Sequence, residues 1–135
     1  MNLTRSFTSL EQLPELLDLV DENAKNAGLP DSLVFRAQVV LEELFVNIFK
    51  HAYQGGEGRA EVTLDAAADG LFLRLEDWGP PFNPLTANLP DLQNRFELGI
   101  PGGAGLLLVR NMGENPRYSR EDGRNILEVL VSVNE

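Results

Sequence analysis

Glu43, Asn47 and His51 recur four residues apart within the stretch VVLEELFVNIFKHAY at residues 39–53. Side chains at this spacing lie one above another on one face of a helix. A carboxylate, an amide and an imidazole in one line could bind a metal ion or a phosphate, or could move a proton. The polar edge of an ordinary amphipathic helix gives the same pattern, so the stripe alone leaves both interpretations open. His51 is the chain's only histidine, and it is either a ligand contact or a packing residue.

A second candidate site is Asp77-Trp78-Gly79, which follows an alternating stretch typical of a strand. An aspartate at a strand end can accept a hydrogen bond from a ligand amine. A glycine two residues later lets a ligand approach the backbone closely. The alternative is a strand-end turn in which Asp77 hydrogen-bonds its own backbone.

The third candidate is the glycine-rich sequence GGAGL at residues 102–106, which precedes an apolar stretch. Glycines before a helix leave amide groups at the positive end of the helix dipole, and this arrangement suits a phosphate. No Gly-Lys-Ser/Thr sequence follows, so the motif is not a P-loop, and the spacing of a dinucleotide-binding fingerprint is absent. A flexible hinge is the alternative interpretation.

Helices are expected to position the first of these motifs. Apolar residues at helical spacing predict one helix over residues 10–28, capped by Thr8 or Ser9. A second helix is expected to begin at residues 31–32, where Asp or Ser caps it, and to stop at the glycine pair 55–56.

Alternating residues predict strands on either side of the other two motifs. The predicted strands span 2–8 (at an edge), 59–66, 71–77, 116–121 and 125–133. Asp69-Gly70 and Asp122-Gly123 are signals for tight hairpin turns between them. Between the two hairpins, residues 78–90 are rich in Pro, Gly and Asn and read as a loop. A short helix is expected over 91–98 and an apolar helix from near Gly105.

This order of elements predicts an α+β fold, in which a mostly antiparallel sheet carries helices on one face as a two-layer sandwich. The chain of 135 residues is expected to form one domain over 1–135. No apolar run approaches the roughly 20 residues of a membrane span, and the N-terminal residues lack the apolar core of a signal peptide. Cysteine is absent, so neither disulfides nor thiolate chemistry is expected, and a cytoplasmic location fits.

The net charge of −10 argues against nucleic acid or an anionic membrane as a partner, because both require a basic surface. A basic protein partner would suit this charge better. An anionic small ligand would need local help from backbone amides, basic side chains or a cation.

Taken together and in this order, the three motifs resemble the ATP-binding (Bergerat) fold of the superfamily that contains gyrase, Hsp90, histidine kinases and MutL. Residues 43–53 are similar to its N box, 77–79 to its first glycine box and 102–106 to its second. Within that superfamily the chain most resembles the stand-alone anti-sigma factor serine/threonine kinases. DWGPPFNP is similar to their D-x-G-x-P-F-[DN]-P, and GGAGLLLVRNM to their G-G-x-G-L-x-L-V-x-x-[ML].

The resemblance implies ATP and Mg²⁺ as cofactors and gives several residues roles. Asn47 would coordinate Mg²⁺, Glu43 would act as general base, and Asp77 would bind the adenine amino group beside Gly79. Residues 84–101 would form a lid over the ATP. The other residues implied to lie near the nucleotide are Lys50, His51, Arg95, Gly102, Gly103, Ala104, Gly105 and Leu106.

The implied function is phosphorylation of an anti-sigma-factor antagonist, together with binding of a sigma factor by the same protein, and the resemblance also suggests a homodimer. One alternative is a non-catalytic ATP-binding module that holds a protein partner. Another is the ATP lobe of a histidine kinase, but the sole histidine lies in the N box. A structural protein without a ligand would require the three ordered motifs to be coincidental.

Overall fold

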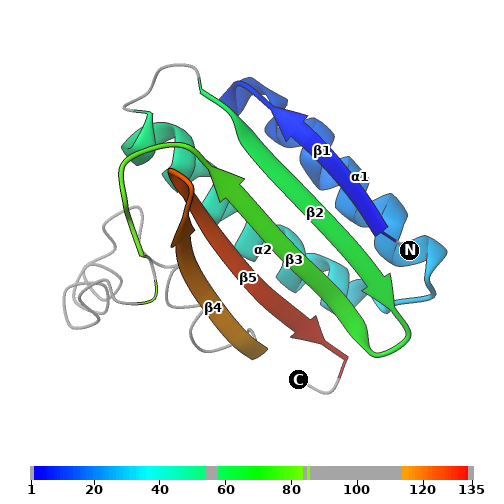
Figure 1. Cartoon of the computed structure of the whole chain (residues 1–135). Helices are drawn as coiled ribbons and strands as arrows, with labels where there is room; N and C mark the ends of the chain where they lie inside the picture. Colours follow the sequence, from blue (N-terminus) through cyan, green and yellow to red (C-terminus); the bar gives the residue numbers. More distant parts are fainter. Residues whose placement is uncertain (1, 54–57, 84, 86–113, 134–135) are drawn as a thin grey trace, which may run out of the picture.

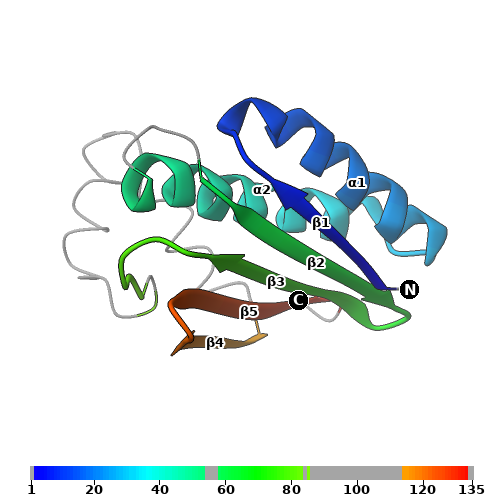
Figure 2. The same cartoon turned by 45° about the horizontal axis from the view of Figure 1, so that its top comes forward.

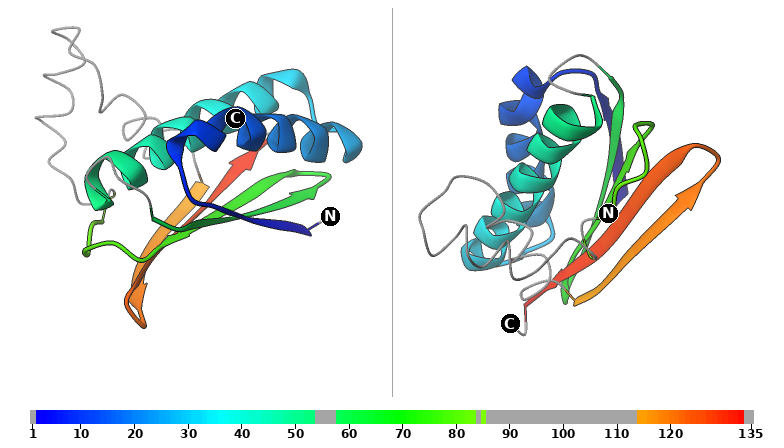
Figure 3. Two further views of the ribbon diagram at one scale, coloured as in Figure 1. Left: turned by 90° about the horizontal axis from the view of Figure 1, so that it is seen from above. Right: turned by 90° about the vertical axis from the view of Figure 1, so that its left-hand side faces the viewer.

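Figure 1 shows the computed structural model of the chain, which describes residues 2–53, 58–83, 85 and 114–133. Five strands form one sheet, and two helices cover one face of it, as Figures 2 and 3 show from different sides. The predicted α+β two-layer sandwich is therefore confirmed. The helices expected over 91–98 and from Gly105 lie outside the described residues.

The sheet is antiparallel throughout its described strands. These are β1 (Asn2–Phe7), β2 (Ala60–Ala67), β3 (Gly70–Asp77), β4 (Glu114–Glu121) and β5 (Arg124–Ser132). They lie in the order β1-β2-β3-β5-β4, with each neighbouring pair antiparallel. The N-terminal strand is at an edge, as the sequence predicts. The central position of β3 buries its end, where Asp77 lies.

The β4–β5 turn confirms the sequence prediction. Asp122 and Gly123 have φ angles of 51° and 76°, the left-handed conformation of the tight turns that suit the twist of a hairpin.

The β2–β3 turn falls one residue earlier than the Asp-Gly signal predicts, on Ala68 and Asp69. Gly70 is instead the first residue of β3. A Cβ there would lie 2.5 Å from the backbone oxygen of Val131 in β5. Close approach of a neighbouring strand, rather than turn geometry, therefore requires this glycine.

Helix α1 (Leu13–Asn26) follows a short 3₁₀ turn, Leu10–Gln12. A capping box between Ser9 and Gln12 begins this segment, which confirms Ser9 among the two predicted caps. Gly28, with φ 78°, lies just beyond the helix end, where a left-handed residue is common.

Helix α2 (Asp31–Asn47) begins differently from the prediction of an Asp31 or Ser32 cap. Pro30 is the N-cap residue, and no side chain caps this helix. The Pro30 carbonyl accepts hydrogen bonds from the backbone of Leu33 and Val34, each at 3.1 Å. The extended backbone of Pro30 allows its carbonyl to start the helical pattern.

The end of α2 widens into a π-helical turn, η2 (Ile48–Ala52). The Tyr53 amide donates to the Ile48 carbonyl at 3.1 Å, five residues back instead of four. A π turn holds more residues than an α turn. The α-helical repeat predicted for the polar stripe therefore runs from Glu43 to Asn47 but does not extend unchanged to His51.

A line of aromatic rings joins β1 to the π turn within the core. Phe7 packs edge-on against Phe45 at 5.5 Å between ring centroids, Phe45 lies 5.0 Å from Phe49, and Phe49 lies 5.6 Å from Tyr53. This packing fixes the last turns of α2 over the sheet. The Asn47 side chain and the β3 end are thereby brought to the same region.

Candidate functional site

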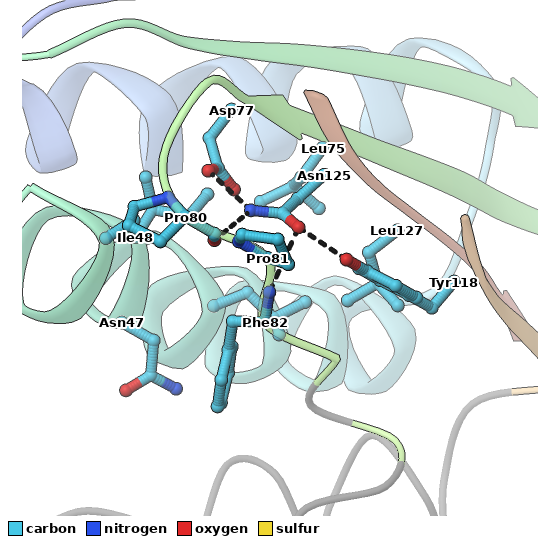
Figure 4. A pocket seen from close by; sticks show the side chains of 12 residues that line it. Asn47, Ile48, Leu75, Asp77, Pro80, Pro81, Phe82, Tyr118, Asn125 and Leu127 are labelled. Atoms are coloured by element: carbon cyan, nitrogen blue, oxygen red, sulfur yellow. Dashed lines mark hydrogen bonds between the residues drawn. The ribbon is translucent and has the colours of Figure 1, made fainter. Parts of the chain in front are cut away.

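A pocket of about 230 Å³ opens between the C-terminal end of α2, the π turn and the neighbouring ends of β3 and β5 (Figure 4). Its polar lining comprises Asn47, Asp77, Tyr118 and Asn125. Its apolar lining comprises Leu44, Ile48, Ala52, Leu75, Pro80, Pro81, Phe82 and Leu127. Apolar walls with a few convergent polar groups are typical of sites for small organic ligands.

Asp77 is the last residue of β3 and is buried. Its Oδ1 accepts a hydrogen bond from the Gly79 amide at 2.9 Å and another from Asn125 Nδ2 at 3.0 Å. Its Oδ2 has no hydrogen bond to any residue that the structure describes. The turn interpretation of the motif is therefore confirmed, because Asp77 accepts a hydrogen bond from the Gly79 amide two residues later, while the predicted role of Asp77 in binding a ligand stays a prediction.

Gly79 is required by packing against the π turn. A Cβ at this position would lie 2.4 Å from the Cβ of Ala52, which is closer than two non-bonded carbon atoms can approach. Arg120 also donates to the Gly79 carbonyl at 2.7 Å. Packing alone therefore explains why residue 79 is a glycine, without any contact to a ligand.

Asn47 is the last α-helical residue of α2 and lines the helix side of the pocket (Figure 4). Its Nδ2 is buried without a hydrogen-bond partner among the described residues. Buried polar groups are normally paired. Of the buried side-chain atoms without a partner among the described residues, the Asn47 amide nitrogen is the one that belongs to a pocket-lining residue.

The other residues of the polar stripe are less central. Glu43 is half-buried one turn before Asn47, but it is not among the residues that line the pocket. Lys50 is exposed. The side chain of His51 lies outside the described part of the structure, as do Arg95 and the whole of Gly102, Gly103, Ala104, Gly105 and Leu106, so their predicted roles stay predictions.

Asn125 and Tyr118 are not among the predicted site residues, but the β4–β5 hairpin brings both into the pocket. The Tyr118 hydroxyl hydrogen-bonds the Asn125 Oδ1. One signal was present: Asn125 occupies a core-facing position of an otherwise apolar alternation that continues through Leu127 and Val129. A polar residue at such a position usually has a specific partner.

Tyr53 ties the end of the π turn to the strand that carries Asp77. Its hydroxyl donates to the Arg59 carbonyl at 2.6 Å and accepts from the Trp78 amide at 2.9 Å. The Arg59 guanidinium lies 4.3 Å from the centre of the Trp78 ring, within the range of a cation–π contact. The stretch 39–53 and the motif at residues 77–79 are therefore connected directly.

Ion pairs link neighbouring residues of the sheet beside the pocket. Glu76 is buried and accepts from Arg74 at 3.1 Å and from Arg124 at 2.7 Å. Arg124 directly precedes Asn125, and Glu76 directly precedes Asp77. The ion pairs therefore hold the two strand ends that carry the buried polar pair of the pocket.

This sheet, covered on one face by two helices, defines an α+β two-layer domain, and its mostly apolar pocket contains one buried carboxylate. The family model of the histidine kinase-like ATPase domain matches residues 8–130. The chain therefore belongs to the histidine kinase-like ATPase domain family. Membership of an ATPase domain family implies nucleotide binding.

Two individual proteins are also similar to this chain. The serine/threonine-protein kinase BtrW of Bordetella bronchiseptica is 32% identical over 96 residues, which cover 70% of this chain and 68% of that protein. A chain in the crystal structure of the SiaB–SiaC complex from Pseudomonas aeruginosa has a TM-score of 0.61 at 16% identity, covering 96% of this chain and 89% of that one. The second likeness bears on the fold alone. No helix within the described ranges has the length and apolar character to cross a membrane.

Proposed function

We propose that the protein is an ATP- and Mg²⁺-dependent serine/threonine protein kinase that phosphorylates an anti-sigma-factor antagonist. We also propose that it binds a sigma factor, forms a homodimer and acts in the cytoplasm. Membership of the ATPase domain family and the similarity to a protein named as a serine/threonine kinase support the enzymatic part. The resemblance of the motifs to anti-sigma factor kinases supports the choice of partners.

The observation that carries the proposal is the meeting of Asp77 and Asn47 in one pocket. They come from different elements and lie far apart in the sequence. In the proposed complex, the Asp77 Oδ2 accepts a hydrogen bond from the adenine amino group, and the apolar walls enclose the base. Asn47 lies towards the phosphates.

The Asn47 carboxamide fits a role beside a bound cation and phosphates. Its Nδ2 is buried and unpaired among the described residues, which costs about 1–3 kcal/mol, and a phosphate oxygen would remove that cost. Its Oδ1 is a hard oxygen ligand of the kind that Mg²⁺ takes together with waters and substrate phosphates. Bound Mg²⁺ would supply neutralisation of charge on the triphosphate.

Glu43 is proposed as the general base because it precedes Asn47 by one helical turn. In the proposed reaction the hydroxyl oxygen of a serine or threonine on the antagonist forms a bond to the γ-phosphorus. The bond between that phosphorus and the β–γ bridging oxygen breaks, and ADP leaves. The hydroxyl proton passes to the Glu43 carboxylate. Lys50, His51, Arg95 and residues 102–106 are proposed as neighbours of the phosphates.

A non-catalytic ATP-binding module that holds a partner is the second candidate. The position of Glu43 favours it, because this residue does not line the pocket between the described elements. Phosphate transfer distinguishes the two candidates, since only the kinase transfers phosphate to an antagonist.

Calorimetry of ATP binding in the presence of Mg²⁺ tests the nucleotide site. We expect Asp77→Asn to weaken binding, because an amide in place of the carboxylate changes the acceptor that meets the adenine amino group. We expect Asn47→Ala to weaken it through the lost cation and phosphate contacts. Each change should cost about 10-fold or more in affinity, the loss of one charged or buried hydrogen bond.

Two matched variants control for the substitutions themselves. Asp69→Asn changes an exposed turn residue, and Asn26→Ala changes the last residue of α1, as Asn47 is the last of α2. Both should bind ATP like the wild type. Binding that is indifferent to Asp77→Asn and Asn47→Ala, or the absence of binding in the wild type, would contradict the proposed site.

A further inference from the structure

Asn125 occupies an unusual place for an amide side chain. It is the second residue of β5, is 6% exposed and pairs in register with Asp77 of β3. Its side chain lies on the sheet face that carries the helices, between Asp77 and the segment that follows β3 (Figure 4).

All the hydrogen-bonding capacity of this amide is used. Nδ2 donates to Asp77 Oδ1 at 3.0 Å and to the Pro80 carbonyl at 2.9 Å. Oδ1 accepts from the Phe82 amide at 3.1 Å and from the Tyr118 hydroxyl. A carboxamide has two donor hydrogens and two acceptor lone pairs. The partners on each side fix which end is nitrogen and which is oxygen.

The segment 79–82 forms one wall of the pocket and follows the end of β3. Side-chain hydrogen bonds, rather than the backbone pairing of a strand, hold it in place. Pro80 and Pro81 have no amide hydrogen to donate. The β4–β5 hairpin instead holds the Pro80 carbonyl and the Phe82 amide through Asn125, and the Gly79 carbonyl through Arg120 at 2.7 Å.

We infer that Asn125 is a positioning residue that sets the base specificity of the pocket, an inference that rests on the proposed nucleotide-binding function. Together with the Gly79 amide it occupies Asp77 Oδ1, which leaves Oδ2 as the single acceptor for the ligand. It also holds the wall formed by Pro80 and Phe82. Asn125 acts through Asp77 and needs no contact with the nucleotide.

A fixed, single carboxylate acceptor discriminates between purines. It pairs with a ring that carries a 6-amino donor, but it meets the 6-oxo group of hypoxanthine acceptor to acceptor. Sites built around a buried polar group reject the mismatched ligand strongly, because that group is left unpaired. Without Asn125, the Gly79 amide alone holds Asp77 Oδ1, so the carboxylate can turn away from an oxo group and the preference weakens.

The test compares the affinities of ATP and inosine triphosphate for the wild type, Asn125→Leu and Tyr118→Phe. We expect Asn125→Leu to reduce the preference for ATP about 10-fold or more, mainly by weakening ATP. Tyr118→Phe removes one of the four bonds and should reduce the preference less. Asn23→Leu is the matched control, because Asn23 is also a buried asparagine but lies on α1, away from the pocket. It should leave the preference unchanged.

Hydrogen exchange of the Phe82 amide, measured without nucleotide, gives an independent readout. The amide should be protected in the wild type and in Tyr118→Phe, and should exchange faster in Asn125→Leu. If Asn125→Leu does not fold, Tyr118→Phe carries the comparison of preferences.

An Asn125→Leu variant that keeps the wild-type preference, or that weakens both nucleotides equally, overturns the inference. If the wild type binds neither nucleotide, the proposed function fails, and the exchange measurement still decides the positioning role. Equal exchange of Phe82 in wild type and Asn125→Leu would then refute that role as well.

Discussion

At the scale of single residues, Asp77 has a structural role in the pocket beside the functional role that we propose for it. Asp77 satisfies the Gly79 amide and Asn125 with one carboxylate oxygen, which holds the carboxylate in place before any ligand arrives. Ordering a carboxylate in advance lowers the cost of binding, because its rotamer need not be fixed when the ligand binds. The second oxygen is then presented in a defined direction.

Glu43 is the residue on which the kinase proposal depends most. We expect Glu43→Ala to slow phosphate transfer to an antagonist by about 10²–10⁴-fold, the usual contribution of a general base, while ATP affinity stays near that of the wild type. Glu42→Ala is the matched control, since Glu42 is an exposed neighbour. Transfer rates measured with labelled ATP check this. Equal rates for both variants would remove Glu43 from the mechanism.

At the scale of elements, the π turn and the segment after β3 pack with almost no space between them. The 2.4 Å that would separate a Gly79 Cβ from the Ala52 Cβ indicates that η2 and this segment are fitted to one another. The π turn therefore has a packing role beside the pocket in addition to ending α2.

We expect Gly79→Ala to lower the free energy of unfolding by about 1–3 kcal/mol, the usual cost of overpacking. Ala52→Gly alone should cost at most about 1 kcal/mol, the propensity penalty of glycine in a helix. In the double variant the methyl clash is gone, so its loss should be smaller than the sum of the single losses. Urea unfolding measures all four proteins. Additive losses would show that the Ala52 contact is not the reason for Gly79.

At the scale of the whole molecule, the net charge of −10 opposes the approach of a triphosphate. Added salt screens such repulsion. We therefore expect ATP affinity to rise a few-fold with ionic strength at constant free Mg²⁺, while the affinity for uncharged adenosine stays nearly constant. Calorimetry at low and near-physiological salt checks this. An affinity for ATP that falls with salt would mean that local basic groups outweigh the net charge.

Within the described residues, the sequence by itself determined the order of the elements and the class of fold. The apolar periodicity, the Ser9 cap and the Asp122-Gly123 turn are local features, and local sterics and hydrogen bonding decide them within a few residues. The motifs also predicted Asp77 and Asn47, which line one pocket in the structure, because the chemistry of each motif is contained in a short stretch. The turn at Gly70 and the start of α2 were predicted wrongly, since a neighbouring strand and the Pro30 carbonyl override the local signals there.

Only the tertiary structure decided which distant residues complete the site. Asn125 lies 48 positions from Asp77 and Tyr118 lies on a separate strand, so no local pattern predicts that they share hydrogen bonds. The need for glycine at 79 likewise arises from Ala52, on another element. The register of β3 with β5 places Asn125 beside Asp77. The packing of the π turn against the segment after β3 places Ala52 beside Gly79. These relations exist only when the whole chain has folded.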